Sequence, residues 1–179
     1  MKWEEIIHFW FEEIEPAKHW VKDLEFDELI RTRFGDVHTA ATKGELYHWR
    51  ETANGRLAEI IVLDQFSRNM FRGHSQSFVS DPKARNLARA GVDAGLDREM
   101  TREERVFFYL PFEHSEDLAD QERAVELISA LGNENYTQYA QAHFDLIKRF
   151  GRFPHRNEVL GRVSTAEEVA YLAQPGSGF

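Results

Sequence analysis

Apolar and polar positions alternate along this chain with the period of helices. In residues 3–14, apolar side chains recur at intervals of three and four, which places them on one helical face. The same spacing runs through 25–43, and residues 134–150 are expected to form another helix that ends at Gly151. Residues 56–72 are so apolar that we expect their helix to be buried on most sides. Strand-like alternation is not convincing anywhere, so the pattern predicts an all-α protein.

Capping residues and helix breakers set the expected ends of the other helices. Helix-start signals occur at Asp81-Pro82, Thr101-x-x-Glu104 and Ser164-x-x-Glu167. Pro111 predicts a kink or break near Leu110, with helix resuming over 116–131. Phe153-Pro154 predicts an extended joint before a short helix that ends at Gly161. We expect a single domain, 1–179, of roughly seven to nine helices.

The composition then excludes several classes of protein. The aromatic share of 13% is too high for a disordered chain, and the absence of cysteine excludes disulfides, thiolate metal sites and cysteine nucleophiles. The net charge of −9 argues against general nucleic-acid binding. The acidic N-terminus and the interruption of the longest apolar stretch by Glu59 argue against a signal peptide and a membrane span, so the expected compartment is the cytoplasm.

A first group of polar residues lies inside the apolar segment 56–72: Asp64, Gln65, Arg68 and Asn69. Asp64 faces Arg68 at i,i+4, and polar groups in such a place are costly unless they are paired. The group is either a pocket wall, with Asp64, Arg68 and Asn69 as ligand-binding residues, or a buried structural network. In both cases we predict that Asp64 and Arg68 are largely buried and interact.

A second group follows Pro111. A histidine with carboxylates nearby can act as an acid/base pair or contribute to a divalent-metal site. The candidate catalytic residues are His114, Glu116, Asp117 and, further along the chain, His143. The alternative is a solvated acidic helix in which Glu116 or Asp120 pairs with Arg123.

A third group surrounds the Phe153-Pro154 joint, where residues 143–162 contain five cations and two acids. The joint leads into an expected helix N-terminus, which attracts anions, and arginine suits carboxylate or phosphate. The candidate ligand-binding residues are Arg152, His155, Arg156 and Asn157. In the alternative, both arginines are already neutralised by Asp145 or Asp117, and Asp145–Arg149 is an ordinary i,i+4 pair.

His114, His143 and His155 have side chains that can ligate a metal, but no compact signature such as H-E-x-x-H is present, so we assign no metal site. The sequence leaves the cofactor unknown. The aromatic residues of the N-terminal part have a simpler interpretation as core. Their alternative is an aromatic-lined groove or a dimer face. These residues are Trp3, Phe9, Trp10, Phe11, Trp20 and Trp49.

Several stretches together resemble a known family. They are 63–73 (LDQFSRNMFRG), 110–118 (LPFEHSEDL), 120–123 (DQER), 143–157 and the ending 174–179 (QPGSGF). Along essentially the full chain, the sequence resembles an uncharacterised, mostly bacterial family, domain of unknown function 924. The resemblance implies a tetratricopeptide-like α-helical fold and no established activity. The chain departs from the usual pattern at Ser67, where proline is more common, at Glu113, where methionine is, and at Glu59.

Three hypotheses about function follow. The favoured one is a binding module that takes a peptide or an anionic small molecule in a concave face lined by Arg, His and Asp. The second is a hydrolase, with or without a divalent metal, acting on an anionic, for example phosphorylated, substrate held by Arg68, Arg152 and Arg156. The third is a purely structural network in a stable dimer, and the sequence leaves a homo-oligomer as one alternative for the oligomeric state. We also predict that His114, Arg68 and the joint 152–157 border one cavity.

Overall fold

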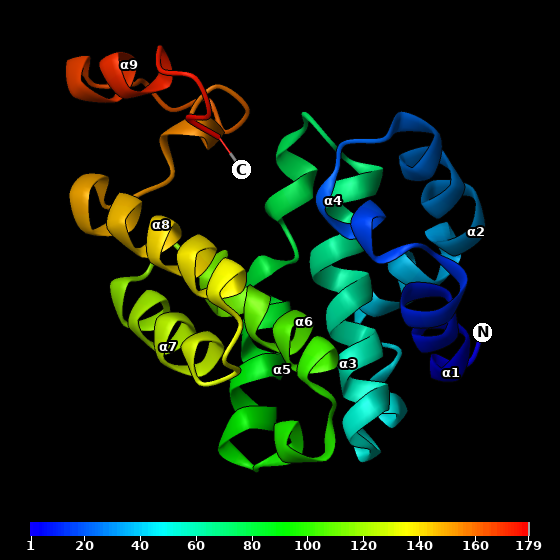
Figure 1. Cartoon of the computed structure of the whole chain (residues 1–179). Helices are drawn as coiled ribbons and strands as arrows, with labels where there is room; N and C mark the ends of the chain where they lie inside the picture. Colours follow the sequence, from blue (N-terminus) through cyan, green and yellow to red (C-terminus); the bar gives the residue numbers. More distant parts are fainter. Residues whose placement is uncertain (179) are drawn as a thin grey trace. The chain divides into compact units, whose positions relative to one another are not determined.

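The computed structural model describes residues 1–178, so Phe179 of the C-terminal motif lies outside the described residues. Regular structure in this part of the chain is helical throughout, which confirms the all-α prediction. The α-helices are α1 (Trp3–His8), α2 (Leu24–Lys43), α3 (Ala53–Ile61), α4 (Ser67–Met70), α5 (Asp81–Asp93), α6 (Arg102–Glu113), α7 (Leu118–Ser129), α8 (Glu134–Phe150) and α9 (Ala166–Leu172) (Figure 1).

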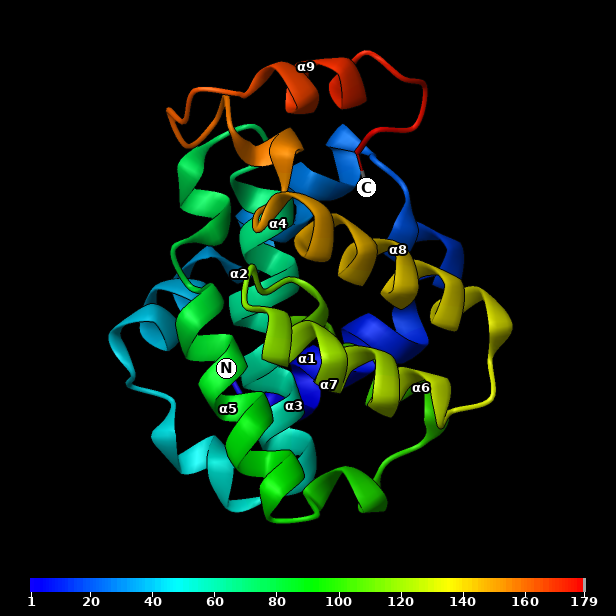
Figure 2. The ribbon, with the colours of Figure 1, turned by 90° about the vertical axis from the view of Figure 1, so that its left-hand side faces the viewer.

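Contacts between residues divide the chain into two compact units. The first comprises Met1–Arg72 and Gln76–Pro111, and the second comprises Gly73–Ser75 and the chain from Phe112 onward. In the first unit, α3 packs against α1 and α5, and α2 packs against α4. In the second, α7 and α8 lie side by side as a helical hairpin, as both Figure 1 and Figure 2 show. The single domain expected from the chain length stays a prediction.

The apolar segment 56–72 is buried, as its composition predicts. Leu57, Ile60 and Phe66 have no exposed surface. The segment is not one regular α-helix, because a π-helical turn over Val62–Phe66 joins α3 to α4. A π turn bonds each residue to the fifth one along and so changes which side chains share a face. The apolar pattern gives no sign of this turn.

Several expected helix ends are shifted. A kink or break was predicted near Leu110, and the break is wrong, because α6 continues through Pro111 to Glu113. The kink stays a prediction. Proline removes only its own N–H and disturbs the preceding turn, and the buried neighbours Leu110 and Phe112 keep this segment packed. Residues 114–117 then form the non-helical connection to α7. The connection places His114 between two helices and not on one.

The capping signals are correct to within a residue. Thr101 and Glu104 form the predicted capping box, in which each backbone N–H donates to the other side chain. The box that opens α9 uses Thr165 and Glu168, one residue later than predicted. Asp81 is the first residue of α5 and not its cap. The predicted ends of α2 and α8 are confirmed, since Gly44 and Gly151 adopt the left-handed conformation with φ of 80° and 69°.

The N-terminal aromatic residues are only partly core. Phe9, Trp10 and Trp49 are almost fully buried. In contrast, Trp20 is 50% exposed and stacks on Phe107 with 5.4 Å between ring centroids. Trp3 is half-buried. The core interpretation therefore holds for some members of the series, and others reach the surface.

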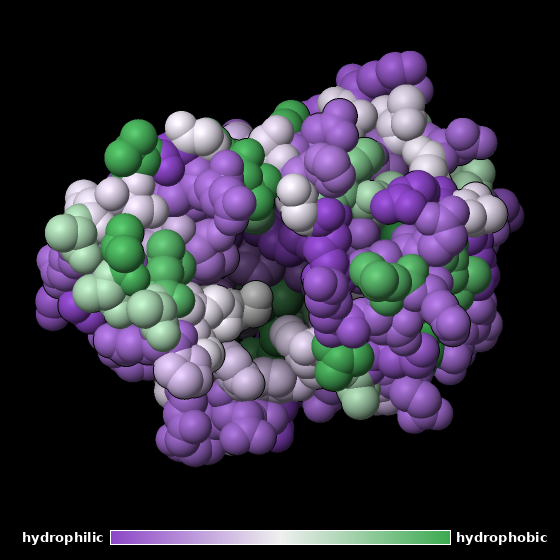
Figure 3. All heavy atoms as spheres, turned by 90° about the horizontal axis from the view of Figure 1, so that it is seen from above, coloured by the Kyte–Doolittle hydropathy of each residue, from purple (hydrophilic) through white to green (hydrophobic). Residues whose placement is uncertain are grey.

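Hydrophilic side chains predominate on the face that Figure 3 shows, and hydrophobic residues appear there in separate small groups. None of the helices in the described part of the chain has the length and apolar character that a membrane crossing requires.

Candidate functional site

The first polar group forms a buried ion network. Asp64 is 1% exposed, and its Oδ1 lies 3.1 Å from Nη1 of Arg68. Arg68 also donates to both carboxylate oxygens of Asp81, at 2.9 and 3.0 Å. Burial acts to lower the pKa of Arg68, but the two carboxylates raise it overall. The prediction that Asp64 and Arg68 are buried and interact is confirmed, and the guanidinium already faces two negative charges.

Asn69 belongs to a neighbouring network. Its Nδ2 donates to Oδ1 of Asp27 at 2.8 Å, and Arg72 donates to both oxygens of the same carboxylate. Gln65 instead donates to Asp64 at 2.7 Å. Asp27 is 3% exposed, so these donors offset the cost of burying its carboxylate. The residues of the first group therefore bond to one another and to α2 and α5, which is the arrangement of the structural alternative.

The connection between α6 and α7 is held through its backbone. Gln121, which is fully buried, donates from Nε2 to the carbonyls of Glu113 and Ser115 at 2.6 and 2.7 Å. Nη2 of Arg156 donates to the intervening carbonyl of His114 at 3.1 Å. Three successive carbonyls thus have donors, and the backbone that carries the His114 imidazole is fixed on both sides.

Acidic residues of the second group have identifiable structural partners. Asp117 is the N-cap of α7 and accepts from the N–H groups of Ala119 and Asp120. Asp120 accepts from Oγ of Ser115 at 2.9 Å. Glu116 accepts two bonds from Arg162, at 2.7 and 2.9 Å, and one from the N–H of Phe153 at 2.8 Å.

Glu116 is therefore held by Arg162, and the pairing of Asp120 with Arg123 stays a prediction. The guanidinium of Arg123 lies over the ring of Phe112, 5.5 Å from its centroid. The pKa of Glu116 lies below its usual value, because the bonds from Arg162 and the Phe153 N–H outweigh the opposing effect of burial.

His143 is a buried, neutral imidazole. Its Nδ1 lies 2.8 Å from the carbonyl of Tyr139 and 3.2 Å from Oε1 of Glu113, so we assign the proton to Nδ1. Burial, and then repulsion from His114 and Arg156, lowers the pKa of His143 to about 3. The ring centroids of His114 and His143 are 6.2 Å apart. Nε2 of His143 therefore carries a lone pair at neutral pH.

The joint after α8 has the predicted extended residue but no helix N-terminus. Phe153 has φ of −86° and ψ of 106°, and Pro154–Arg156 form a three-residue 3₁₀ turn. The N–H of Arg156 donates to the carbonyl of Phe153, and that of Asn157 to the carbonyl of Pro154. The expected row of free N–H groups is therefore absent from this joint, and an anion would have to bind to side chains.

Arg152 is already neutralised by a carboxylate. It donates to both oxygens of Glu168, at 2.6 and 2.7 Å, and to the carbonyl of Val163 at 2.9 Å. The bonds from Arg152 lower the pKa of Glu168 to about 2. Neutralisation was the alternative weighed from the sequence, but its suggested partners, Asp145 and Asp117, are wrong for Arg152.

Asn157 completes the same network. It is 1% exposed, donates to Oγ of Ser164 at 3.0 Å and to Oε2 of Glu168 at 3.3 Å, and accepts from Nε of Arg162 at 2.9 Å. Because each polar atom of this amide has a partner within the protein, Asn157 has the environment of a structural residue.

Residues of the second and third groups meet around Phe153. The guanidinium carbon of Arg156 lies 4.5 Å from the Phe153 ring centroid, and the rings of His143 and His155 each lie 5.5 Å from it. Burial, and then the charge of Arg156, lowers the pKa of His155 to about 4. We call His114, His143, Phe153, His155 and Arg156 the histidine cluster.

Arg68 belongs to the first unit, so its place beside this cluster stays a prediction. Within residues 1–178, no three His, Asp or Glu side chains are arranged to hold a metal ion.

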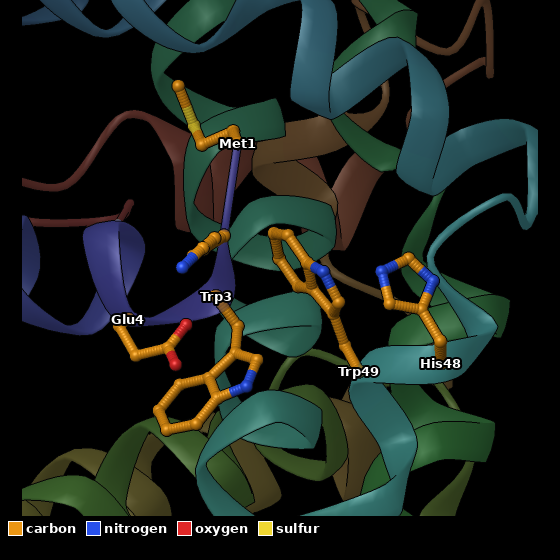
Figure 4. A pocket seen from close by; sticks show the side chains of 6 residues that line it. Met1, Trp3, Glu4, His48 and Trp49 are labelled. Atoms are coloured by element: carbon orange, nitrogen blue, oxygen red, sulfur yellow. The ribbon is translucent and has the colours of Figure 1, made fainter.

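Two hollows have no counterpart among the candidate residues. One, of about 230 Å³, is lined by Glu122 and Val125 of α7 and by Gln141 and Phe144 of α8. The other, of about 250 Å³, lies in the first unit, where the start of α1 meets the 3₁₀ turn Tyr47–Glu51 (Figure 4). It is lined by Met1, Lys2, Trp3, Glu4, His48 and Trp49. The sequence gives one indication of the second hollow, because Trp3 and Trp49 belong to the aromatic series whose alternative interpretation is an aromatic-lined groove.

A family model described as a bacterial protein of unknown function, DUF924, matches residues 6–176. The chain belongs to this family. A solved structure, of a protein of unknown function from Agrobacterium tumefaciens, is 44% identical to the chain, with a TM-score of 0.91 and 96% of each chain covered. None of the curated proteins matches. The family resemblance carried by the sequence motifs is confirmed.

The three positions at which the family resemblance implies other residues, Ser67, Glu59 and Glu113, carry buried polar side chains with partners. Ser67 donates to the carbonyl of Leu63 and bonds to His38 of α2. Glu59 accepts two bonds of 2.7 Å from Arg50. Glu113 lies against His143, as described above. At each of these positions the cost of burying a polar group is offset by a specific partner.

Proposed function

We propose that this protein is a binding module that holds an anionic group beside the histidine cluster of the second unit. The chemistry recognised is a carboxylate or phosphate, whether of a small molecule or of a peptide. The observation that carries the proposal is the convergence of three imidazoles and Arg156 around Phe153, from three separate segments of the chain.

Electrostatics support an anion at this place. The charge of Arg156 contributes to the low pKa values of both His143 and His155, so protonation of these rings is opposed by a cation already present. A bound anion would offset that repulsion and favour the protonated rings. Binding would then be linked to proton uptake, and it would strengthen as the pH falls. Glu116 and Glu168 are held by Arg162 and Arg152, which limits their repulsion of the ligand.

The test is an NMR titration of the histidine ring signals against pH, with and without phosphate. Phosphate is expected to raise the pKa of His155 in the wild type and to do so less in His114→Gln. Arg149→Ala, which removes an exposed cation of the same unit, is the control and should behave as the wild type. An unchanged His155 titration, or an equal response in all three proteins, contradicts the proposal.

The source of the anion is distinguished with two further ligands. A short peptide with a free C-terminal carboxylate is compared with the same peptide as its amide. A rise in the pKa of His155 with the carboxylate form alone favours a peptide ligand. A rise with phosphate alone favours a small phosphorylated molecule. Under the same proposal, the α7–α8 hairpin is part of a tetratricopeptide-like arrangement and the protein acts in the cytoplasm as a monomer or homo-oligomer.

A hydrolase is the second candidate, and one contact favours it. Oε1 of Glu113 lies 3.2 Å from Nδ1 of His143, which is how a carboxylate orients an imidazole that acts as a base. Against this, an imidazole with a pKa of about 3 is a weak base at neutral pH, and Glu116 and Asp117 are occupied by Arg162 and by the α7 cap. Hydrolysis of p-nitrophenyl phosphate or acetate by the wild type, lost in His143→Gln, would support this candidate.

A further inference from the structure

The pocket in the first unit differs from the polar networks in what its side chains offer to a ligand. In Figure 4, the indoles of Trp3 and Trp49 lie next to each other, with the Glu4 carboxylate on the Trp3 side and the His48 imidazole on the Trp49 side. Trp49 is 2% exposed and therefore anchored in the core. Trp3 is half-buried and keeps part of its ring surface accessible. The pocket thus has a rigid aromatic wall.

The charged side chains of Lys2 and Glu4 in this pocket can pair with a ligand, because neither is engaged in an ion pair among the described residues. Lys2 and Glu4 are exposed and of opposite sign, and neither forms an ion pair within the described part of the chain. By comparison, Arg68, Arg152 and Arg162 are each held by carboxylates at 2.6–3.1 Å. A ligand that enters this pocket would therefore meet charged side chains of both signs without displacing an existing partner.

We propose that this pocket binds a small zwitterion, namely a free amino acid with an aromatic side chain. Its ring would stack on Trp3, its ammonium group would pair with Glu4, and its carboxylate would pair with Lys2. Aromatic rings attract both planar rings and cations, so the indole contributes to two parts of this ligand. A pocket of about 250 Å³ is smaller than those of drug-sized ligands, which agrees with a ligand of one residue.

The probe is L-phenylalanine, compared with two molecules that each lack one charge. Phenethylamine keeps the ammonium group, and 3-phenylpropionate keeps the carboxylate. Affinities are measured by isothermal titration calorimetry or by ligand-observed NMR, with any tag at the C-terminus so that Met1 and Lys2 are unaltered. L-Phenylalanine is expected to bind at least about tenfold more tightly than either partial ligand, because it alone uses both charges.

The variants separate the two contacts. Glu4→Gln should weaken the binding of L-phenylalanine and phenethylamine and leave the affinity for 3-phenylpropionate unchanged. Lys2→Gln should weaken the binding of L-phenylalanine and 3-phenylpropionate only. Trp3→Leu should weaken the binding of all three ligands. Circular dichroism verifies that this variant is folded. Lys22→Gln and Glu25→Gln change exposed charges elsewhere in the unit and should bind as the wild type does.

Two results would overturn the inference. One is the absence of L-phenylalanine binding, or the same affinity in Lys2→Gln, Glu4→Gln and the wild type. The other is phenethylamine binding as tightly as L-phenylalanine, which would make the pocket a site for cations. The inference does not depend on the histidine cluster, because phosphate binding there is expected to be the same in Glu4→Gln as in the wild type.

Discussion

The ion pair Asp64–Arg68 of the first unit and the pair Arg149–Glu167 of the second lie in opposite environments. The side chains of the first pair are 1% and 19% exposed, whereas those of the second are 51% and 61% exposed. A buried charge that loses its partner cannot recover its hydration, but an exposed charge exchanges its partner for water at little cost. Burial therefore decides which ion pairs of this protein are structural.

Spacing along a helix does not decide which charged residues form an ion pair. Asp145 and Arg149 have the same i,i+4 spacing as Asp64 and Arg68, and the sequence predicted a pair at both places. The second prediction is wrong, because Asp145 accepts from Gln141 at 2.8 Å and Arg149 donates to Glu167 at 2.8 Å. On an exposed helix face several partners are nearly equal in energy, so spacing alone does not select one.

The largest effect is expected for Asp64→Ala. The variant removes one of the two carboxylates that face Arg68 and leaves a largely buried charge incompletely paired. The free energy of unfolding should fall by about 3–5 kcal/mol, measured by urea denaturation. Asp145→Ala is the matched control, since it removes a carboxylate at the same spacing from an exposed face, and it should change stability little. Equal losses in the two variants would show that burial is not the deciding factor.

A smaller loss is expected for Glu168→Gln. Its carboxylate is 2% exposed and accepts from Arg152 and from the N–H of Thr165 at 2.7 Å, so the unfolding free energy should fall by about 1.5–3 kcal/mol at pH 7. The pKa of about 2 lies below the ordinary 4.5, so the unfolded state binds a proton first as the pH falls. The stabilisation is therefore complete above pH 4.5 and lost towards pH 2.

The control for this variant is Glu167→Gln, which changes the adjacent and exposed carboxylate that pairs with Arg149. Its stability should stay close to that of the wild type at every pH. Thermal unfolding from pH 2 to 7 checks both expectations. A gap between wild type and Glu168→Gln that stays constant over this range would speak against the ionised, buried carboxylate.

The pH dependence between 6.5 and 4.5 should come from the buried histidines. The pKa of His143 is lowered from 6.5 to about 3, so the unfolded state takes up a proton in this window and the native state does not. Stability should therefore fall as the pH decreases, by up to about 1.4 kcal/mol per pH unit. In His143→Gln this slope should be shallower, whereas His74→Gln, which changes an exposed histidine, should keep it.

The smallest effect is expected for Arg149→Ala. The exposed pair with Glu167 should contribute less than about 0.5 kcal/mol and become weaker in salt. Urea denaturation at low and high ionic strength measures both quantities. A loss of several kcal/mol would mean that the end of α8 and the start of α9 are coupled through this pair, and it would remove the contrast with Asp64–Arg68.

The sequence anticipated much of the fold and part of the candidate site. Asp64–Arg68 was predictable because two charges at helical spacing inside an apolar run have few other partners. The partners of Arg152 and Glu116 were not predictable, because Glu168 and Arg162 lie 16 and 46 residues away along the chain. The pocket at Trp3 and Trp49 was not predictable either, since the sequence pattern of an aromatic residue is the same whether its side chain fills a core or lines a pocket.

By itself, the sequence determined the all-helical class, the termination of α2 and α8 at Gly44 and Gly151, and the burial of the segment around Asp64. These features depend on periodicity, caps and breakers, which act over a few residues. The arginines that are already neutralised, the histidines that surround Phe153 and the indoles that border a pocket became known from the folded structure alone. Those outcomes depend on which distant side chains packing brings together and on how much water it leaves around them.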